Sequence, residues 1–147
     1  MNIIDQLIQF HRGEWFQAHD KQTDEQLRLY FETMVRKNRM IFAMQGDEVL
    51  GYAESYRLDY AQFGRLVCGE DIVVDREDVE TGPIAYLANV HVKEAHQSSW
   101  PIKYLKLEFF KQNYTASYFC GYAERKKHRP WKIFKRQQLQ EVITREL

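Results

Sequence analysis

The sequence predicts an α/β (α+β) fold in which a mixed, mostly antiparallel sheet is flanked by helices. Apolar residues follow helical spacing near the N-terminus, two strand-type runs flank a tight turn, and a strand–loop–helix–strand unit comes later. With 147 residues the chain is long enough to bury a real core. We expect a single domain over 1–147 with a long excursion at 59–83.

The composition excludes several classes of protein. A hydrophobic share of 44% and a charged share of 29% are typical of a globular protein and not of a disordered one. The 21 basic and 21 acidic residues balance, so net charge favours neither nucleic acid nor membrane. No apolar run reaches the roughly 20 residues of a membrane helix, and the N-terminus lacks a secretory signal. Cys68 and Cys120 lie far apart without metal-ligand spacing, so we expect no metal and a cytoplasmic setting.

The first elements are predicted to be two helices and a hairpin. Helical spacing covers 3–8 and 27–35, and Thr23 followed by Gln26 predicts a capping box at the second helix. Strand-type runs at 40–44 and 49–56 then flank Gly46 and Asp47. Glycine tolerates the positive φ that the first central position of a two-residue hairpin turn requires.

The excursion at 59–83 has a weaker pattern. Leu66–Cys68 and Ile72–Val74 fit short strands, although glycines and a proline interrupt the segment. Most of the residues at 70–80 are acidic. Connections of this length are commonly functional or mobile.

The second half predicts two strands joined by a helix. The strands are 84–92 and 118–123, and the helix runs from 101 to 113 with proline in its first turn. Residues 130–138 predict a short helix. Residues 139–144 fit either a last strand or a helical tail.

The loop between the strand and the helix carries a specific pattern. Val92 ends the strand, Gln97 lies in the loop, and Leu105 lies in the helix. With the preceding Gly-Asp hairpin, this order resembles the GNAT family of N-acetyltransferases over about residues 24–138. The resemblance implies the acyl-CoA N-acyltransferase fold, binding of acetyl-CoA, and transfer of its acetyl group to an amine of a small molecule or a protein.

The loop also departs from the pattern of the family. Trp100 and Ile102 occupy the two positions where the family has small residues, which let the backbone approach the CoA pyrophosphate. Pro101 removes one backbone donor, and Ser98 and Ser99 supply hydroxyl donors in partial compensation. Some phage-encoded members of the family resemble this loop, with a serine and bulky residues.

The resemblance implies further site residues. The family tyrosine that protonates the departing thiolate has Phe134 as its nearest match, which has no hydroxyl. The acid that often serves as general base has no counterpart in 84–87. The cofactor-binding residues that the resemblance implies are Asn89, Val90, His91, Val92, Gln97, Ser98, Ser99, Trp100 and Ile102.

Two residues are weak candidates for catalysis. His91 ends the strand that would lie beside the thioester, and an imidazole can take a proton from an amine near neutral pH. Glu54 lies in the preceding strand. The alternative for each is an ordinary strand side chain without a catalytic role, and His96 is either a phosphate contact or a solvated loop residue.

The basic run at 125–136 has three interpretations. It is a solvated helix face, it pairs with the acidic residues at 70–80, or it binds phosphate of nucleic acid with Trp131 and Phe134 available for stacking. Two functions therefore stay open. One is an acetyl-CoA-dependent N-acetyltransferase, and the other is a catalytically inactive GNAT-fold module, of phage origin on one reading, that binds protein or nucleic acid.

Overall fold

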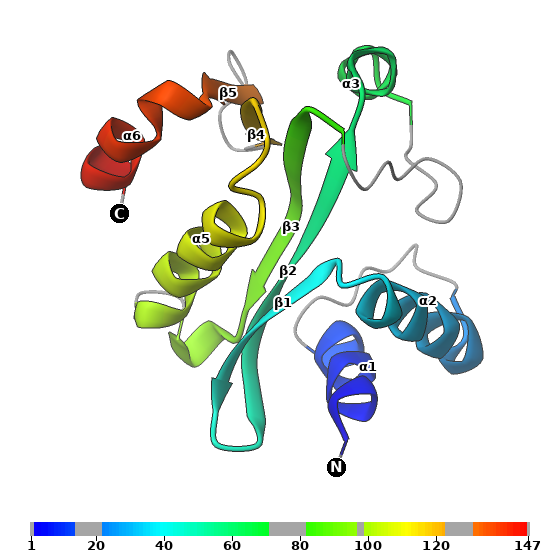
Figure 1. Ribbon diagram of the computed structural model, residues 1–147. Helices are drawn as coiled ribbons and strands as arrows, with labels where there is room; N and C mark the ends of the chain where they lie inside the picture. The colour runs from blue at the N-terminus through cyan, green and yellow to red at the C-terminus, as the bar shows by residue number, and fades with distance from the viewer. Residues whose placement is uncertain (1, 14–21, 71–81, 97–98, 123–130, 147) are drawn as a thin grey trace. The chain divides into compact units, whose positions relative to one another are not determined.

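Five strands in the order β1-β2-β3-β4-β5 form one sheet in the computed structural model of the protein. The structure describes residues 2–13, 22–70, 82–96, 99–122 and 131–146 (Figure 1). Its elements are α1 (Ile3–Gly13), α2 (Asp24–Arg36), β1 (Met40–Gln45), β2 (Glu48–Leu58), α3 (Tyr60–Val67), β3 (Ile84–Val92), η1 (Glu94–His96), α5 (Trp100–Gln112), β4 (Tyr118–Tyr122), β5 (Trp131–Lys135), η2 (Arg136–Gln138) and α6 (Leu139–Glu146).

The chain divides into two compact units, which are described separately below. The first comprises Met1–Glu54 and Asn89–Leu105, and the second comprises Ser55–Ala88 and Lys106–Leu147. β2, β3 and α5 each contribute residues to both units.

The first unit is built on the predicted hairpin. β1 and β2 are antiparallel, with Gln45 opposite Glu48 across the turn. Gly46 has a φ of +60°, the positive value that the sequence argument required at this position. The predicted hairpin is therefore confirmed.

Two helices of the first unit pack their apolar stripes together and against β2. Thr23 and Gln26 form the predicted capping box, because each side chain accepts from the backbone N–H of the other. The buried residues that α1 and α2 contribute are Leu7, Ile8, Phe10, Leu27, Phe31 and Met34. Phe10 and Phe31 both contact the ring of Tyr52, with centroids 5.6 and 6.0 Å away.

The second unit joins β3 to β4 and β5. β3 and β4 are parallel from Ile84↔Tyr118 to Leu87↔Gly121, and α5 precedes β4 in the chain as the crossover helix that a parallel pair needs. β5 is antiparallel to β4. The sheet is therefore mixed and mostly antiparallel, as predicted.

Aromatic rings form the core of the second unit. Phe109 and Phe110 of α5 contact Phe119 of β4 edge to face, and Phe134 of β5 stacks on Phe119 with centroids 5.4 Å apart. Buried Arg57 adds a polar anchor, since its Nε donates to the carbonyl of Gly82 over 2.7 Å.

Two predicted elements are wrong. The short helix predicted at 130–138 contains β5 instead, because Phe134 gains a cross-strand partner in Phe119. The strand predicted at Leu66–Cys68 is the end of α3, which begins with a capping box between Asp59 and Gln62. Residues 139–144, left open above, are helical in α6. The strand predicted at Ile72–Val74 lies outside the described residues.

Candidate functional site

Four side chains meet on one face of the sheet in the first unit. Tyr52 and Glu54 lie two residues apart on β2, so they share a face, and Asn89 and His91 do the same on β3. Glu54 bonds to Asn89, and the ring of Tyr52 lies 5.1 Å from that of His91. From Tyr52 to Glu54 along β2, the contacting residue on β3 changes from His91 back to Asn89. The two strands are therefore antiparallel here. We call these four residues, together with Tyr30 and His11, the Glu54 cluster.

Glu54 is the buried acid of the cluster, with 3% of its surface exposed. Its Oε2 accepts from the Tyr30 hydroxyl over 2.7 Å and from Asn89 Nδ2 over 2.8 Å. Burial raises the pKa of the Glu54 carboxyl, and the bonds from Tyr30 and Asn89 oppose this shift. The carboxylate is therefore a stronger base than an exposed one, and two donors fix its orientation.

His91 is mostly shielded from solvent beside Tyr52. Burial, and to a smaller extent the electrostatic effect of His11, lowers the pKa of its imidazole to about 4. The imidazole is therefore neutral at pH 7. The pKa of the Tyr52 hydroxyl is raised above its ordinary value, mainly by burial and then by the charge of Glu54.

Sequence reasoning placed Glu54 and His91 on separate strands and did not include Tyr30, His11 or Tyr52. Helical spacing gave a signal for two of these. His11 lies four residues after buried Leu7, and Tyr30 lies three after buried Leu27. The helices that cover this face of the sheet therefore supply polar groups to it, and the structure brings together both predicted catalytic candidates.

The backbone of β3 passes very close to β2 at the predicted cofactor strand. A Cβ on Gly51 would lie 2.8 Å from the carbonyl oxygen of His91 and 2.9 Å from Val92 Cγ2. The amide of Lys93 donates to the carbonyl of Leu50 over 2.9 Å. Val90 is half-buried and Val92 is buried. The end of β3, which was predicted to bind the cofactor, therefore packs closely against β2.

The N-terminus of α5 carries the predicted phosphate-binding residues that the structure describes. Trp100 is 45% exposed and meets the ring of Tyr104 edge to face at 5.6 Å. Pro101 is fully buried and Ile102 is half-buried. The amide of exposed Ser99 donates to the carbonyl of His96 over 3.1 Å. Gln97 and Ser98 lie outside the described residues.

The comparison with the family tyrosine placed Phe134 in a helix, but Phe134 does not lie in one. It lies on β5 and stacks on Phe119 in the core of the second unit. An aromatic residue in this position packs the sheet. No thiolate-protonating role follows from it.

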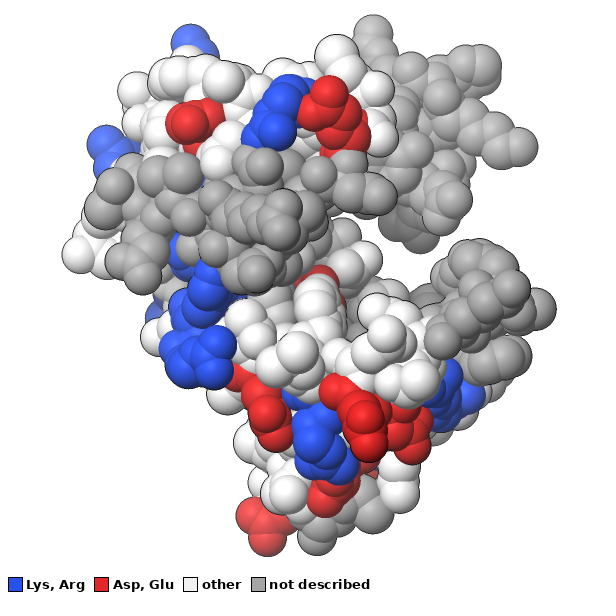
Figure 2. All heavy atoms as spheres, turned by 90° about the vertical axis from the view of Figure 1, so that its right-hand side faces the viewer, with Lys and Arg blue, Asp and Glu red and all other residues white. Residues whose placement is uncertain are grey.

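The basic run at 125–136 is only partly described. Lys132 and Lys135 lie on β5 and Arg136 begins η2, so these three do not form one helix face. Residues 125–130 and most of the acidic residues at 70–80 lie outside the described part. On the face that Figure 2 shows, acidic and basic side chains lie beside one another. Arg28 and Asp5 form an ion pair at 2.6 Å.

Within residues 2–13, 22–70, 82–96, 99–122 and 131–146, no three His, Cys, Asp or Glu side chains are grouped so that they could hold a metal ion. Likewise, none of the helices described there has the length and apolar character needed to cross a membrane.

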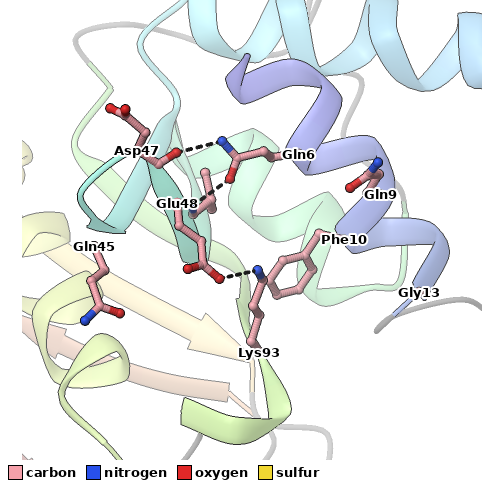
Figure 3. A pocket seen from close by; sticks show the side chains of 9 residues that line it. Gln6, Gln9, Phe10, Gly13, Gln45, Asp47, Glu48 and Lys93 are labelled. Atoms are coloured by element: carbon pink, nitrogen blue, oxygen red, sulfur yellow. Dashed lines mark hydrogen bonds and ion pairs between the residues drawn. The ribbon is translucent and has the colours of Figure 1, made fainter. Parts of the chain in front are cut away.

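A polar pocket of about 700 Å³ lies beside the β1–β2 turn (Figure 3). Gln6 of α1 spans to the hairpin, since its Nε2 donates to the carbonyl of Asp47 over 2.7 Å and its Oε1 accepts from the amide of Val49 over 2.8 Å. Lys93 Nζ donates to Glu48 Oε1 over 2.9 Å and holds the pKa of that carboxyl below its usual range. These polar contacts hold the hairpin to α1 and to Lys93, the residue that follows β3.

Known structures share this fold at low sequence identity. The loading GNATL domain of CurA from Lyngbya majuscula matches with a TM-score of 0.62 over 85% of this chain and 63% of its own, at 14% identity. The GphF GNAT-like decarboxylase in complex with isobutyryl-CoA matches with a TM-score of 0.59 over 80% and 60%, at 13% identity. The chain thus spans less than two thirds of either structure. Neither a protein-family model nor a curated protein matches the sequence.

Proposed function

We propose that this chain, whose fold is GNAT-like, binds an acyl-CoA and transfers the acyl group to an amine. The observation that carries the proposal is Glu54, a buried carboxylate with a raised pKa held by Tyr30 and Asn89. Buried groups with perturbed pKa values and defined partners are frequent in active sites. A fold neighbour that was solved with isobutyryl-CoA agrees with this class of substrate.

In the proposed reaction the amine attacks the thioester carbonyl directly. A C–N bond forms, the C–S bond breaks, and the electron pair leaves on the sulfur of CoA. Glu54 takes the proton that the amine loses, and the departing thiolate gains one proton to become CoA thiol. The products are an amide and CoA thiol. One proton is lost by the amine nitrogen and one is gained by the sulfur, so the overall reaction neither releases nor consumes a proton.

Glu54 suits the role of base better than His91 does. An efficient general base has a pKa near the working pH, and burial moves that of Glu54 toward it. Burial moves the pKa of His91 away from it, to about 4. We therefore assign the proton to Glu54 and propose that His91, neutral beside Tyr52, orients the reacting groups.

For the acyl-CoA we propose the strand end Asn89–Val92 and the start of α5. The first amides of a helix have no intrahelical acceptor and so suit a phosphate. The exposure of Trp100 supports this proposal, because its ring is turned to solvent against Tyr104 and does not fill the core. Gln97, Ser98, Ser99 and Ile102 complete the proposed set. The acetyl group, the acceptor amine, the phage-type loop and the cytoplasmic setting stay predictions from the sequence.

The second candidate is an inactive GNAT-fold module that binds a protein or nucleic acid. It is favoured by the loop itself, where Trp100 and Ile102 replace small residues and Pro101 lacks a donor. Exposed Trp100 and Tyr104 then form an aromatic surface instead of a cofactor entrance.

Calorimetric titration with acetyl-CoA, isobutyryl-CoA and free CoA separates the two candidates. Micromolar binding of either acyl-CoA supports the transferase, and no heat up to millimolar concentration supports the module. The variant Trp100→Gly with Ile102→Gly is expected to bind more tightly if bulk in the loop limits affinity.

Glu54→Gln then tests the chemistry. It keeps the size of the side chain and an acceptor oxygen but cannot take a proton, so acyl-CoA binding should persist. Transfer to an amine should fall by about 10²- to 10⁴-fold, the usual contribution of a general base. Unchanged transfer in this variant would refute the role of Glu54.

A further inference from the structure

Among the described residues that form the Glu54 cluster, Asn89 is the exposed one. It lies on β3, and its Nδ2 donates to Glu54 Oε2 over 2.8 Å. Glu54 itself has 3% of its surface exposed. Asn89 therefore joins the buried carboxylate directly to the surface of the protein, where a molecule from solution can meet it.

The bond to Glu54 fixes the orientation of the Asn89 amide. A carboxylate oxygen only accepts hydrogen bonds, so Nδ2 and not Oδ1 must face it. Oδ1 is attached to the same carbon as Nδ2, so it lies within about 5 Å of Glu54 Oε2. Two hydrogen bonds of ordinary length together span more than this distance. One nitrogen atom can therefore bond to Asn89 Oδ1 and to the carboxylate at the same time.

The carboxylate of Glu54 has acceptor positions for such a nitrogen. The bonds that it accepts from Tyr30 and Asn89 both go to Oε2. An ionised carboxylate offers lone pairs on both of its oxygens, and neither of these two donors uses those of Oε1. Oε1 can thus take a proton from the nitrogen while Asn89 Oδ1 accepts a second N–H.

We infer that Asn89 contacts the nitrogen of the acceptor through Oδ1 and selects primary amines. A primary amine that attacks a thioester loses one hydrogen to the base and keeps the other on the product amide. Glu54 receives the hydrogen that is lost, and the one that is kept donates to Asn89 Oδ1. A secondary amine has a single hydrogen, which goes to Glu54, so none remains for Asn89. This inference rests on the proposed transfer of an acyl group to an amine.

A purely structural role for Asn89 predicts a different result. Tyr30 and Asn89 donate to the same oxygen, and both bonds lower the pKa of the Glu54 carboxyl. Removing either donor should therefore raise that pKa and change transfer to primary and secondary amines alike. A direct contact between Asn89 and the acceptor has a further effect, because its loss changes the preference between the two kinds of amine.

The test compares the transfer of an acetyl group from acetyl-CoA to propylamine and to N-methylpropylamine. In the parent chain kcat/KM should be higher for propylamine. Asn89→Leu keeps the approximate size of the side chain and removes Oδ1, so this preference should fall about two- to tenfold, the usual range for one hydrogen bond. Tyr30→Phe is the matched control and should keep the ratio of the two amines. An unchanged ratio in Asn89→Leu would overturn the inference and leave the proposed function standing.

A binding measurement without acyl-CoA distinguishes failure of the inference from failure of the proposed function. In ¹⁵N-labelled protein, propylammonium should shift the side-chain amide signals of Asn89, which are assigned by their loss in Asn89→Leu. Tetramethylammonium, which has the same charge and no N–H, should not shift them. If this difference is seen in a parent that transfers nothing, the proposed transfer fails and the contact with Asn89 stands. Equal shifts with both ions, or none with either, would overturn the inference. A circular-dichroism melt checks that each variant is folded.

Discussion

Asn89 Nδ2 donates to Glu54 Oε2 over 2.8 Å, across the pairing of β3 with β2. The same oxygen accepts from the Tyr30 hydroxyl of α2. Two donors therefore favour the charged carboxylate while burial favours the neutral one, and burial has the larger effect. These opposing effects set the pKa of the Glu54 carboxyl and so its strength as a base. Removing either donor should change that pKa.

Tyr30→Phe removes one of the two donors without removing the ring. Because the Tyr30 bond lowers the pKa of Glu54, its loss should raise that pKa further. The ¹³C resonance of the Glu54 carboxyl, followed by NMR across a pH series, measures the shift. Tyr114→Phe, at a side chain that is 69% exposed, is the control and should leave the titration unchanged.

His91 should make the protein less stable in acid. Its pKa is about 4 in the folded chain and about 6.5 in the unfolded one. Between these values the unfolded state binds more protons, so stability falls as the pH falls from 6.5 to 4. The shift corresponds to about 3 kcal/mol. Urea unfolding at several pH values should show a shallower fall in His91→Gln than in the parent, whatever the stability of the variant at pH 7.

Glu54 should have the opposite effect in an overlapping pH range. Its folded pKa is raised, so the folded state holds the proton more firmly than the unfolded state does. The contribution is full below about 4.5 and is lost as the pH rises through the folded pKa. Relative to the parent, Glu54→Gln should therefore gain stability as the pH rises above about 4.5. If the two unfolding curves keep a constant separation over this range, Glu54 does not carry a raised pKa.

Local signals in the sequence predicted most elements, and non-local pairing explains the errors. Thr23 with Gln26 predicted the start of α2 because a capping box involves only neighbouring residues. Asp59 with Gln62 gave the same signal for α3 but was not used. The strand that contains Phe134 depends on a partner in β4, which no local pattern contains.

In the candidate site, too, local patterns predicted the elements, whereas contacts between distant residues were not predicted. Alternation placed Glu54 and His91 on strands, but which residues lie opposite them depends on the register between β2 and β3. That register, and the packing of α1 and α2 over the sheet, bring Asn89, Tyr30 and His11 to the carboxylate and the imidazole. Neither is encoded in a short window of sequence.

The close approach of β2 to β3 at Gly51 gives a further prediction. In Gly51→Ala the new Cβ would press on the His91 carbonyl oxygen and on Val92, so stability should fall by about 1–3 kcal/mol. Gly64→Ala is the matched control in α3, where a Cβ meets nothing within 4 Å. That change should stabilise the protein by about 0.5–1 kcal/mol, because alanine favours a helix. Urea unfolding measures both, and equal effects would contradict the close approach.

Gln6 should anchor the β1–β2 hairpin to α1. Gln6→Leu removes both bonds to the turn, those with the carbonyl of Asp47 and the amide of Val49. At about 0.5–1.5 kcal/mol for each bond, stability should fall by about 1–3 kcal/mol. Gln9→Leu, at an exposed side chain of the same helix and the same pocket, should change it by less than about 0.5 kcal/mol.

Hydrogen exchange distinguishes loss of this anchor from general destabilisation. In Gln6→Leu the amide of Val49 should exchange faster by a larger factor than the amides in the middle of β2, since its own acceptor is removed. Gln9→Leu should leave the ratio unchanged. If all β2 amides speed up equally, Gln6 contributes to global stability and does not anchor the turn through Val49.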